Sequence, residues 1–397
     1  MNNPISIAEQ VYWIGVNDRE TALFENLWPL DKGVAYNSYL IVDKKVTLLD
    51  TVKINKMELY FEKVRQVLGD RDVDYLIINH MEPDHSGAIK EAIHYFPNIQ
   101  IVGNRKTLEM LQNFYGIDHP FYCVGDGDIL DLGERKLQFH LTPMVHWPET
   151  MMTYDQRDGI LFSMDAFGGF GSLDGGIFDD EVNLEFYEDE IRRYFSNIVG
   201  KYSGMVQKAL KKLQGLDVRI VAPTHGPVWR ENPKHIISLY DGWSRYEAEK
   251  GVVIVYGSMY GNTAKMAEYI ARRLSENGIT NIRLFDSSKT HVSYIISEIW
   301  RFKGVILGSC AYNTGLFPTM ETVINKIENS ALKNRILGIF GNYSWSGGGV
   351  INLEAFSERI KWEKVGESVE AKSSPKEEDF KKCDLMAREM AARLQDA

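Results

Sequence analysis

Cysteine is scarce in this sequence of 397 residues, and its three cysteines (Cys123, Cys310 and Cys383) lie far apart. No C-x-x-C pair is present, so the sequence encodes neither a cysteine-ligated zinc site nor a rubredoxin-type iron site. Three scattered cysteines do not make a disulfide framework, and they are typical of a reducing compartment. Any metal site in this chain must therefore use other ligands.

An excess of basic charge and long apolar runs are also absent from the sequence. The 45 Lys and Arg residues are outnumbered by 55 Asp and Glu residues, and the net charge of −10 argues against binding to nucleic acid or to an anionic membrane surface. No apolar run approaches transmembrane length, and residues 1–10 lack the basic and apolar regions of a signal peptide. These absences predict a soluble, cytoplasmic protein. Its length is sufficient for two or three domains.

One short stretch is dense in side chains that bind metals. Residues 78–87 carry the pattern H-x-E-x-D-H, which is formed by His80, Glu82, Asp84 and His85. The apolar run 75–78 predicts a buried strand before it, and the apolar spacing over 88–96 predicts a helix after it. The candidate ligands would then lie on a turn between two rigid elements. A polar loop with a helix cap is the plainer alternative, but imidazoles and carboxylates at this density favour a metal site.

Three further candidate ligands stand at the ends of predicted strands, which cover residues 137–145, 160–164 and 218–222. They are His146, Asp165 and His225. Each of them alone is more typical of a hydrogen-bonded loop residue than of a ligand. Strand ends on one side of a sheet sandwich converge, however, so the three together favour a site shared with the H-x-E-x-D-H stretch.

The sequence pattern changes near Lys250. Residues 252–256 form a continuous apolar run, which is typical of a strand buried on both faces of a parallel sheet. More strands are expected at 281–285, 304–308 and 336–340, and they alternate with helices expected at 263–276, 291–301, 318–330 and 376–395. This alternation predicts a doubly wound parallel sheet. We therefore expect two domains, 1–249 and 250–397.

Three loops after strands of the second domain combine glycines, hydroxyls and aromatic rings. The first loop precedes a helix, where hydroxyls and free backbone N–H groups form an anion site. It lacks both G-K-[ST] and G-x-G-x-x-G, which disfavours a nucleoside triphosphate and a dinucleotide and leaves FMN as the better fit. Ordinary α/β loops are the competing interpretation. The candidate FMN contacts are Ser258, Met259, Tyr260, Gly261, Asn262, Thr263, Ser309, Cys310, Ala311, Tyr312, Asn313, Gly341, Asn342, Tyr343, Ser344, Trp345, Ser346 and Gly347.

Together these motifs resemble those of the flavodiiron proteins (A-type flavoproteins), and the resemblance covers essentially the whole chain. The first part is similar to a metallo-β-lactamase-type αββα sandwich, and the second part is similar to a flavodoxin. Hydrolytic relatives usually carry H-x-H-x-D-H and bind zinc. Here Glu82 replaces the middle histidine and adds a hard, anionic oxygen ligand, which favours iron.

The resemblance also implies a role for each candidate ligand. One iron would be bound by His80, Glu82 and His146. The other would be bound by Asp84, His85 and His225, although in some members of the family the histidine that matches His85 is not bound. Asp165 would bridge the two ions.

By the same resemblance, we expect an oxidoreductase that reduces O2 to water, NO to N2O, or both. A head-to-tail homodimer or dimer of dimers is implied, with an external electron donor such as rubredoxin, because this looks like the two-domain form of the family. Two alternatives stay open. The first is a metallo-β-lactamase-type hydrolase with a fused flavodoxin, against which Glu82 argues. The second is a non-catalytic flavin electron carrier, against which the complete ligand set argues.

Overall fold

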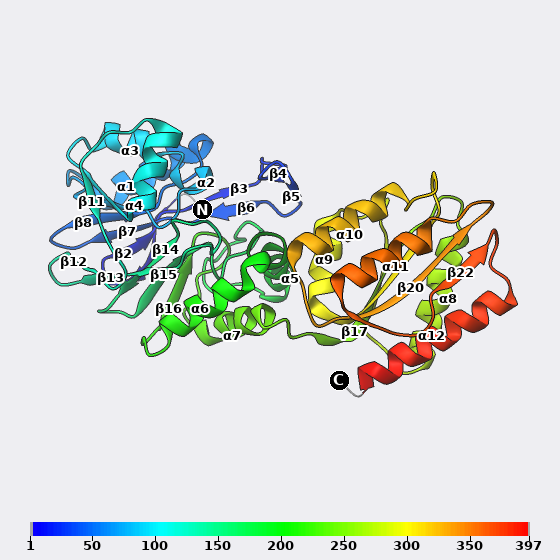
Figure 1. Cartoon of the computed structure of the whole chain (residues 1–397). Helices are drawn as coiled ribbons and strands as arrows, with labels where there is room; N and C mark the ends of the chain where they lie inside the picture. The colour runs from blue at the N-terminus through cyan, green and yellow to red at the C-terminus, as the bar shows by residue number, and fades with distance from the viewer. Residues whose placement is uncertain (1–2, 396–397) are drawn as a thin grey trace. The chain divides into compact units, whose positions relative to one another are not determined.

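The computed structural model of the chain describes residues 3–395 and contains two compact units, Met1–Asp241 and Gly242–Ala397. In Figure 1 the first unit runs from blue to green and the second from yellow-green to red. The division falls within helix α7 (Pro233–Ser244), shortly before the boundary at residues 249 and 250 that the sequence predicts. The two-domain assignment with that boundary remains our proposal.

Two large sheets form the first unit. One sheet contains, in spatial order, β1 (Ile5–Ala8), β2 (Val11–Trp13), β7 (Tyr39–Val42), β8 (Val46–Leu49), β9 (Tyr75–Ile77), β10 (Gln100–Gly103) and β11 (Phe121–Cys123). The other contains β12 (Ile129–Asp131), β13 (Lys136–Leu141), β14 (Met151–Asp155), β15 (Ile160–Met164) and β16 (Ile220–Pro223). Short pairs are formed by β3 (Val16–Asp18) with β6 (Val34–Tyr36), and by β4 (Leu23–Phe24) with β5 (Trp28–Pro29).

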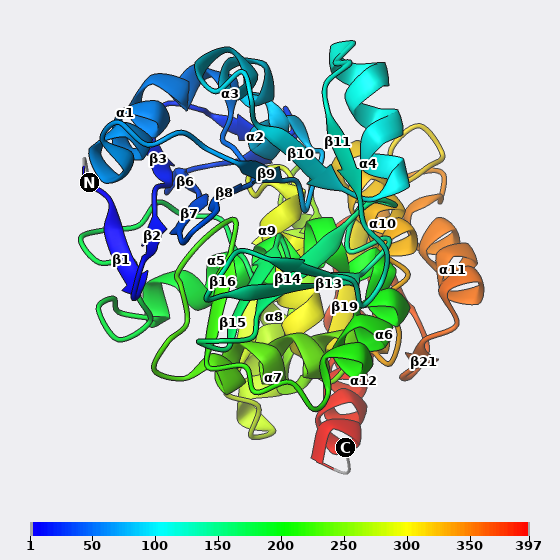
Figure 2. The ribbon, with the colours of Figure 1, turned by 90° about the vertical axis from the view of Figure 1, so that its left-hand side faces the viewer.

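Helices cover the two sheets on both sides. In Figure 2, α1 (Met57–Leu68) and α3 (Ile89–Tyr95) lie above the sheets, and α6 (Ser203–Leu213) and α7 lie below them. The sheets pack face to face, since the rings of Tyr39 on β7 and Phe162 on β15 have centroids 5.2 Å apart. This is the αββα arrangement that the resemblance to a metallo-β-lactamase-type sandwich implies. The other helical segments of the unit are η1 (Ile54–Lys56), α2 (Pro83–Ser86), α4 (Arg105–Met110), η2 (Leu111–Tyr115), α5 (Glu185–Tyr194), η3 (Phe195–Val199) and η4 (Gly200–Tyr202).

Two expectations about this unit are wrong in detail. The strand expected over 137–145 ends at Leu141, so His146 lies in a loop rather than at a strand end. Pro143 has no N–H group for the sheet, and the loop closes on itself through a hydrogen bond from Met144 N to Trp147 O (2.7 Å). The sequence also favours a helix over about 235–249, but α7 ends at Ser244 and residue 249 already begins strand β17 (Glu249–Gly257).

A parallel sheet forms the second unit. Its strands are, in spatial order, β18 (Ile282–Asp286), β17 (Glu249–Gly257), β19 (Phe302–Cys310) and β20 (Ile336–Tyr343), and β20 also pairs with β21 (Glu363–Lys364) and β22 (Val369–Lys372). The order 2-1-3-4-5 is that of a flavodoxin-like doubly wound fold. The helices are α8 (Asn262–Glu276), α9 (Val292–Arg301), α10 (Pro318–Ser330), α11 (Gly349–Ile360) and α12 (Glu377–Gln395).

The predicted strands and helices of this unit are all present, but α11, β21 and β22 were not expected. Helix α11 begins inside a glycine-rich loop, which hides its start. It buries Val350, Leu353 and Phe356, which are spaced three residues apart. Strand β22 is only four residues long and alternates buried Val369 and Ala371 with exposed charged residues. The two strands are therefore too short to be recognised from periodicity, and the glycines before α11 conceal where that helix begins.

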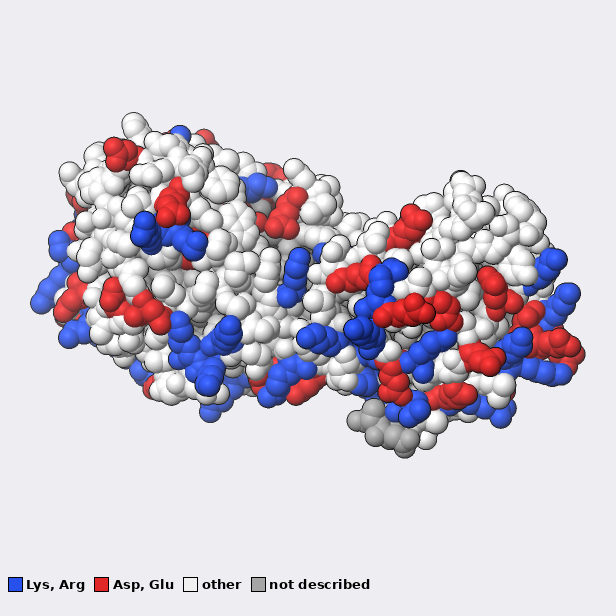
Figure 3. Space-filling view, in the orientation of Figure 1, with Lys and Arg blue, Asp and Glu red and all other residues white. Residues whose placement is uncertain are grey.

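The distribution of surface charge and the apolar character of the helices can both be compared with what the sequence predicts. On the face shown in Figure 3, acidic and basic side chains are interspersed over both units. The net charge of −10 is therefore not gathered into one acidic patch on this face. Across residues 3–395, no helix combines the length and the apolar character that crossing a membrane requires.

Candidate functional site

The H-x-E-x-D-H stretch follows β9 and continues into the one-turn helix α2. The first two predicted ligands precede this helix, whereas Asp84 and His85 lie inside it. The carboxylate of Asp50, at the end of β8, accepts hydrogen bonds from the backbone N–H groups of Asn79 (2.8 Å) and His80 (3.2 Å). The predicted turn is therefore held at its start by a buried carboxylate and at its end by a helical turn.

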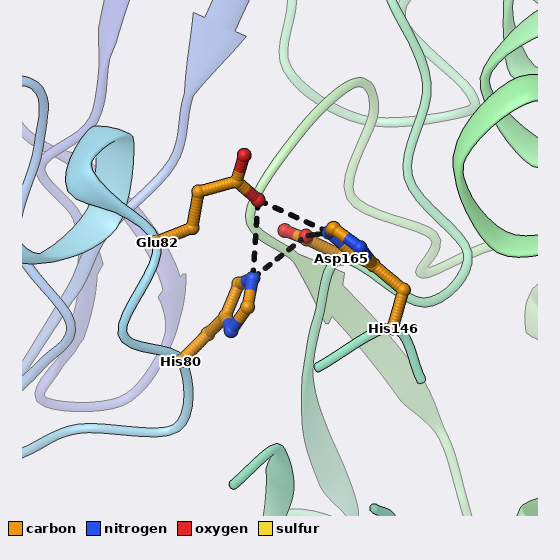
Figure 4. A group of neighbouring side chains, drawn as sticks. All are labelled: His80, Glu82, His146 and Asp165. Atoms are coloured by element: carbon orange, nitrogen blue, oxygen red, sulfur yellow. Dashed lines mark hydrogen bonds and ion pairs between the residues drawn. The ribbon is translucent and has the colours of Figure 1, made fainter. Parts of the chain in front are cut away.

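Four of the predicted ligands form the first group, which is drawn in Figure 4: His80, Glu82, His146 and Asp165. Glu82 Oε2 lies 3.2 Å from His80 Nε2 and 3.0 Å from His146 Nε2. Asp165 Oδ2 lies 3.3 Å and 3.1 Å from the same two nitrogens. All four residues are buried, and their donor atoms point toward one common place. This is an arrangement that a single cation can bind.

The second group contains the other three predicted ligands, Asp84, His85 and His225. The Nε2 atoms of the two histidines are 3.0 Å apart, and each lies 3.4 Å from Asp84 Oδ2. Within residues 3–395, neither carboxylate oxygen of Asp84 has a hydrogen-bond partner, although both are buried. A buried carboxylate without hydrogen bonds is costly, and a bound cation would remove that cost.

Asp165 connects the two groups. Its Oδ2 atom faces the first group, while Oδ1 lies 3.1 Å from His85 Nε2 and 3.5 Å from His225 Nε2. The hydroxyl of Thr224 donates a hydrogen bond to Oδ1 (2.7 Å) and fixes the plane of the carboxylate. The geometry of Asp165 therefore suits a carboxylate shared by two cations.

The electrostatics of the site also fit cations. Burial opposes the charged form of His80, but the charge of Asp165 and hydrogen bonds with Asp165, Glu149 and Glu82 together outweigh burial and raise the pKa of His80 well above its usual value. His80 and His85 in turn hold the pKa of Asp165 well below its usual range, again against burial. In the metal-free protein, protonated imidazoles thus balance the carboxylates, and divalent cations can take the place of those protons. A donor set of histidines and carboxylates without thiolate suits iron.

Several residues that support the site were not expected from the sequence. Thr224 holds the shared carboxylate, and Glu149 accepts a hydrogen bond from His80 Nδ1 (2.8 Å). The sequence indicates Phe24 and Trp147 as candidates to line the site, with simple packing as the equal alternative. The ring of Phe24 lies 5.5 Å from that of His225, and the ring of Trp147 lies 5.3 Å from that of His80. No sequence pattern distinguishes Thr224 and Glu149, because they act through contacts with distant parts of the chain.

A cavity of about 260 Å³ lies in the second unit, among the loops that follow β17, β19 and β20. It is lined by Ser258, Met259, Tyr260, Asn262, Thr263, Cys310, Ala311, Asn313, Thr314, Asn342, Tyr343, Ser344, Trp345 and Ser346. Apart from Thr314, all of these are predicted FMN contacts. The predicted residues that do not line the cavity are Gly261, Ser309, Tyr312, Gly341 and Gly347. The three loops are therefore brought together as expected.

The chemistry of this cavity fits a flavin mononucleotide. Its lining contains no Lys, Arg, Asp or Glu, so a phosphate there would depend on hydroxyls and on backbone N–H groups at the start of α8. Ser258 Oγ already accepts hydrogen bonds from Gly261 N (3.1 Å) and Ala264 N (3.4 Å). Two large rings flank the opening and are almost fully exposed, Tyr260 at 88% and Trp345 at 91%. Exposed rings of this kind can stack on a flat ligand.

Comparisons with known proteins agree with this geometry. The family model described as "ODP family beta lactamase" matches residues 34–226, and the flavodoxin family model matches residues 254–384. A nitric oxide reductase from Moorella thermoacetica is 32% identical over 404 residues, covering 100% of both chains. A flavodiiron protein from Giardia intestinalis has a TM-score of 0.93 and 26% identity, covering 99% of this chain and 97% of that one. The chain belongs to the flavodiiron protein family.

A second solved structure supports membership in the flavodiiron family. Rubredoxin oxygen:oxidoreductase from Desulfovibrio gigas superposes with a TM-score of 0.95 at 28% identity, and 99% of each chain is covered. The resemblance and the fold class inferred from the sequence are therefore confirmed. The individual ligand and flavin contacts of this flavodiiron protein remain assignments that we propose from its own geometry.

Proposed function

We propose that this protein is a flavodiiron oxidoreductase that reduces O2 to water, NO to N2O, or both. The observation that carries the proposal is the pairing of two buried donor groups across the carboxylate of Asp165. The relatives named nitric oxide reductase and rubredoxin oxygen:oxidoreductase support both substrates. The metallo-β-lactamase-type hydrolase and the electron carrier without a metal are not favoured.

The seven predicted ligands would hold two iron ions, one in each of the two groups, with the carboxylate of Asp165 available to both. When bound, the iron pair binds and reduces the substrate, and FMN supplies it with electrons. To bind these metals, the carboxylates would have to be ionised and the histidines neutral. Three carboxylates against two ferrous ions leave about one positive charge, which favours a small anionic or polarisable ligand. The rings of Phe24 and Trp147 border the site and limit access of water.

The FMN is proposed to occupy the cavity of the second unit. Ser258 and Thr263 lie where the phosphate would bind, next to the N-terminus of α8. Tyr260 and Trp345 would stack on or cover the flavin ring, which explains the exposure of two large aromatic side chains. Residues of the predicted loops that do not line the cavity, such as Gly261 and Gly341, would shape the loops around it.

The partners of the enzyme follow from the family. An external electron donor, rubredoxin or a similar carrier, would reduce the FMN. A head-to-tail homodimer or a dimer of dimers would bring the flavin of one chain to the di-iron site of another. Exposed Trp345 supports this arrangement, because such a ring is stabilised when a ligand or a second chain covers it.

The test is an anaerobic titration of the fully reduced protein with O2 and, separately, with NO, in the presence of a reduced donor. We expect consumption of at least one gas, with two irons and one FMN per chain. Asp165→Asn is the matched control: it keeps the shape of the side chain but removes the shared charge, and it should abolish turnover while FMN remains bound. Two zinc ions per chain, ester or phosphodiester hydrolysis and no consumption of either gas would overturn the proposal.

A further inference from the structure

The two halves of the metal centre are supported differently on the side that faces away from the metals. We call the group of His80, Glu82 and His146 the His80 half, and the group of Asp84, His85 and His225 the His225 half. His80 Nδ1 lies 2.8 Å from a carboxylate oxygen, Oε1 of Glu149. His225 Nδ1 donates instead to a backbone carbonyl, that of Ala35, over the same distance of 2.8 Å. One half therefore has an anionic partner behind its histidine, and the other has a neutral partner.

Glu149 is held firmly in this position. Its side chain is buried, with 1% of the residue exposed, and Oε1 also accepts a hydrogen bond from Met81 N (2.9 Å). The backbone carbonyl of Glu149 accepts a hydrogen bond from the side chain of Asn104. The residue lies in the loop 142–150, which also carries the ligand His146. The loop thus contributes one ligand directly and orients a second one from behind.

We infer that Glu149 is a positioning residue that makes the His80 half the tighter of the two metal positions. A carboxylate that accepts the Nδ1–H proton fixes the tautomer of the imidazole and increases the basicity of Nε2. His80 Nε2 lies 3.2 Å from Glu82 Oε2 and 3.3 Å from Asp165 Oδ2, so it faces the place where the donor atoms meet. A backbone carbonyl fixes the tautomer of His225 in the same way but adds no negative charge.

The distribution of charge supports the same asymmetry. Asp165 offers one oxygen to each half, and each half has one carboxylate of its own, Glu82 or Asp84. Glu149 therefore places a carboxylate in hydrogen-bond contact with a ligand imidazole of the His80 half, and none makes such a contact behind His225. The buried carboxylate of Asp50, which also interacts with His85, accepts hydrogen bonds from the side chain of Asn79 and from the backbone at residues 79 and 80 instead. A divalent cation is attracted more strongly where more carboxylates surround it. This inference rests on the proposed two-metal function and assigns an order of binding within it.

The experiment is an anaerobic titration of the metal-free chain with Co2+, whose visible absorption reports each occupied site without turnover. We expect the wild-type protein to bind two equivalents in two resolved steps. Glu149→Gln keeps the size and the acceptor oxygen but removes the charge, and it should weaken the first step about 10- to 100-fold. Glu109→Gln is the matched control, because Glu109 lines the same surface cleft as Glu149 and its exposed side chain pairs with Arg105 rather than with a ligand.

Two ligand variants identify the half that fills first. His225→Ala should retain the tight first step, and His146→Ala should lose it. Two equivalents that bind the wild-type protein with equal affinity would overturn the inference, as would an unchanged first step in Glu149→Gln. If Glu149→Gln does not fold, the wild-type titration and the two ligand variants still decide. The two proposals can also be told apart. If the Co2+ steps are resolved but the iron-loaded protein consumes neither O2 nor NO, the proposed function is rejected and the asymmetry of the two metal positions is retained.

Discussion

Replacing Gly261 by Asp and by Asn tests where the phosphate of FMN binds. Gly261 precedes α8 with φ of +89°, and a Cβ atom added there would meet no atom within 4 Å. Both side chains therefore fit, and both carry the strain of a left-handed backbone, which Asn and Asp tolerate better than most residues. The two variants have nearly the same shape and differ by one negative charge.

The expected magnitude follows from the uncharged lining of the cavity. Because the lining contains no Lys or Arg, no basic side chain there compensates an added carboxylate. A carboxylate about 5 Å from a phosphate dianion costs about 1–3 kcal/mol in surroundings close to water. This corresponds to FMN binding that is about 5- to 150-fold weaker in Gly261→Asp than in Gly261→Asn. The backbone strain, about 1–2 kcal/mol for most residues, is shared by both variants and cancels in the comparison.

The assay is a titration of the FMN-free proteins that follows the quenching of flavin fluorescence. Raising the ionic strength from about 0.01 M to about 1 M shortens the screening length from about 30 Å to about 3 Å, so the difference between the variants should shrink. The metal content should be the same in both, because Gly261 belongs to the second unit and the proposed ligands belong to the first. Equal affinities of the two variants at low salt would show that the phosphate binds elsewhere.

Three further predictions concern the metal site and the thiols. Thr224→Val removes the hydroxyl that donates to Asp165, and it should weaken metal binding about 10- to 100-fold in a chelator competition, since hydrogen bonds to charged groups contribute about 1.5–3 kcal/mol; Thr224→Ser should bind as the wild type does. Despite burial, neighbouring carboxylates raise the pKa of both His85 and His146 from 6.5 to about 9 in the metal-free protein. The two protonated histidines therefore contribute fully to the folding stability of the metal-free protein below pH 6.5, and this contribution is lost as the pH rises through 9. Metal binding should therefore release protons, and its affinity should increase as the pH rises towards 9. Calorimetry in buffers of different ionisation enthalpy measures the number of protons released. Metal binding at pH 7 without proton release would contradict the prediction. Cys123 is exposed and the other cysteines are buried, so a thiol reagent should react rapidly with one thiol per native chain; rapid reaction of all three would contradict the fold.

The candidate metal ligands could be recognised in the sequence because the signal of the first four is local and dense. His80 and His85 stand only five residues apart in a stretch that also carries two carboxylates, and such a density is visible without any structure. His146 was recognised for a partly wrong reason, since it lies in a loop after β13 rather than at a strand end. The loop nevertheless carries it to the same place, because Glu82 and Asp165 lie within hydrogen-bond distance of its Nε2 atom.

The supporting residues could not be predicted because their partners are distant in the sequence. Glu149 is 69 residues from His80, and Thr224 is 59 residues from Asp165. A single threonine or glutamate in a loop has no periodicity, and its meaning depends on the tertiary contact alone. The same holds for Asp50, whose carboxylate holds the backbone at residues 79 and 80 from the end of a neighbouring strand.

The support behind each histidine also bears on the second half of the metal centre. His80 has a carboxylate on Nδ1 and His225 has a carbonyl there, whereas His85 Nδ1 is buried and has no hydrogen-bond partner among the residues that the structure describes. No hydrogen bond on the far side therefore fixes the tautomer of this imidazole, and only packing holds its ring in place. Its Nε2 atom nevertheless lies 3.0 Å from that of His225 and 3.1 Å from Asp165 Oδ1, which is the place of a ligand. Of the two histidines in the second group, His85 should therefore be the easier to displace from a bound metal, because a rotation of its ring breaks no hydrogen bond on the far side.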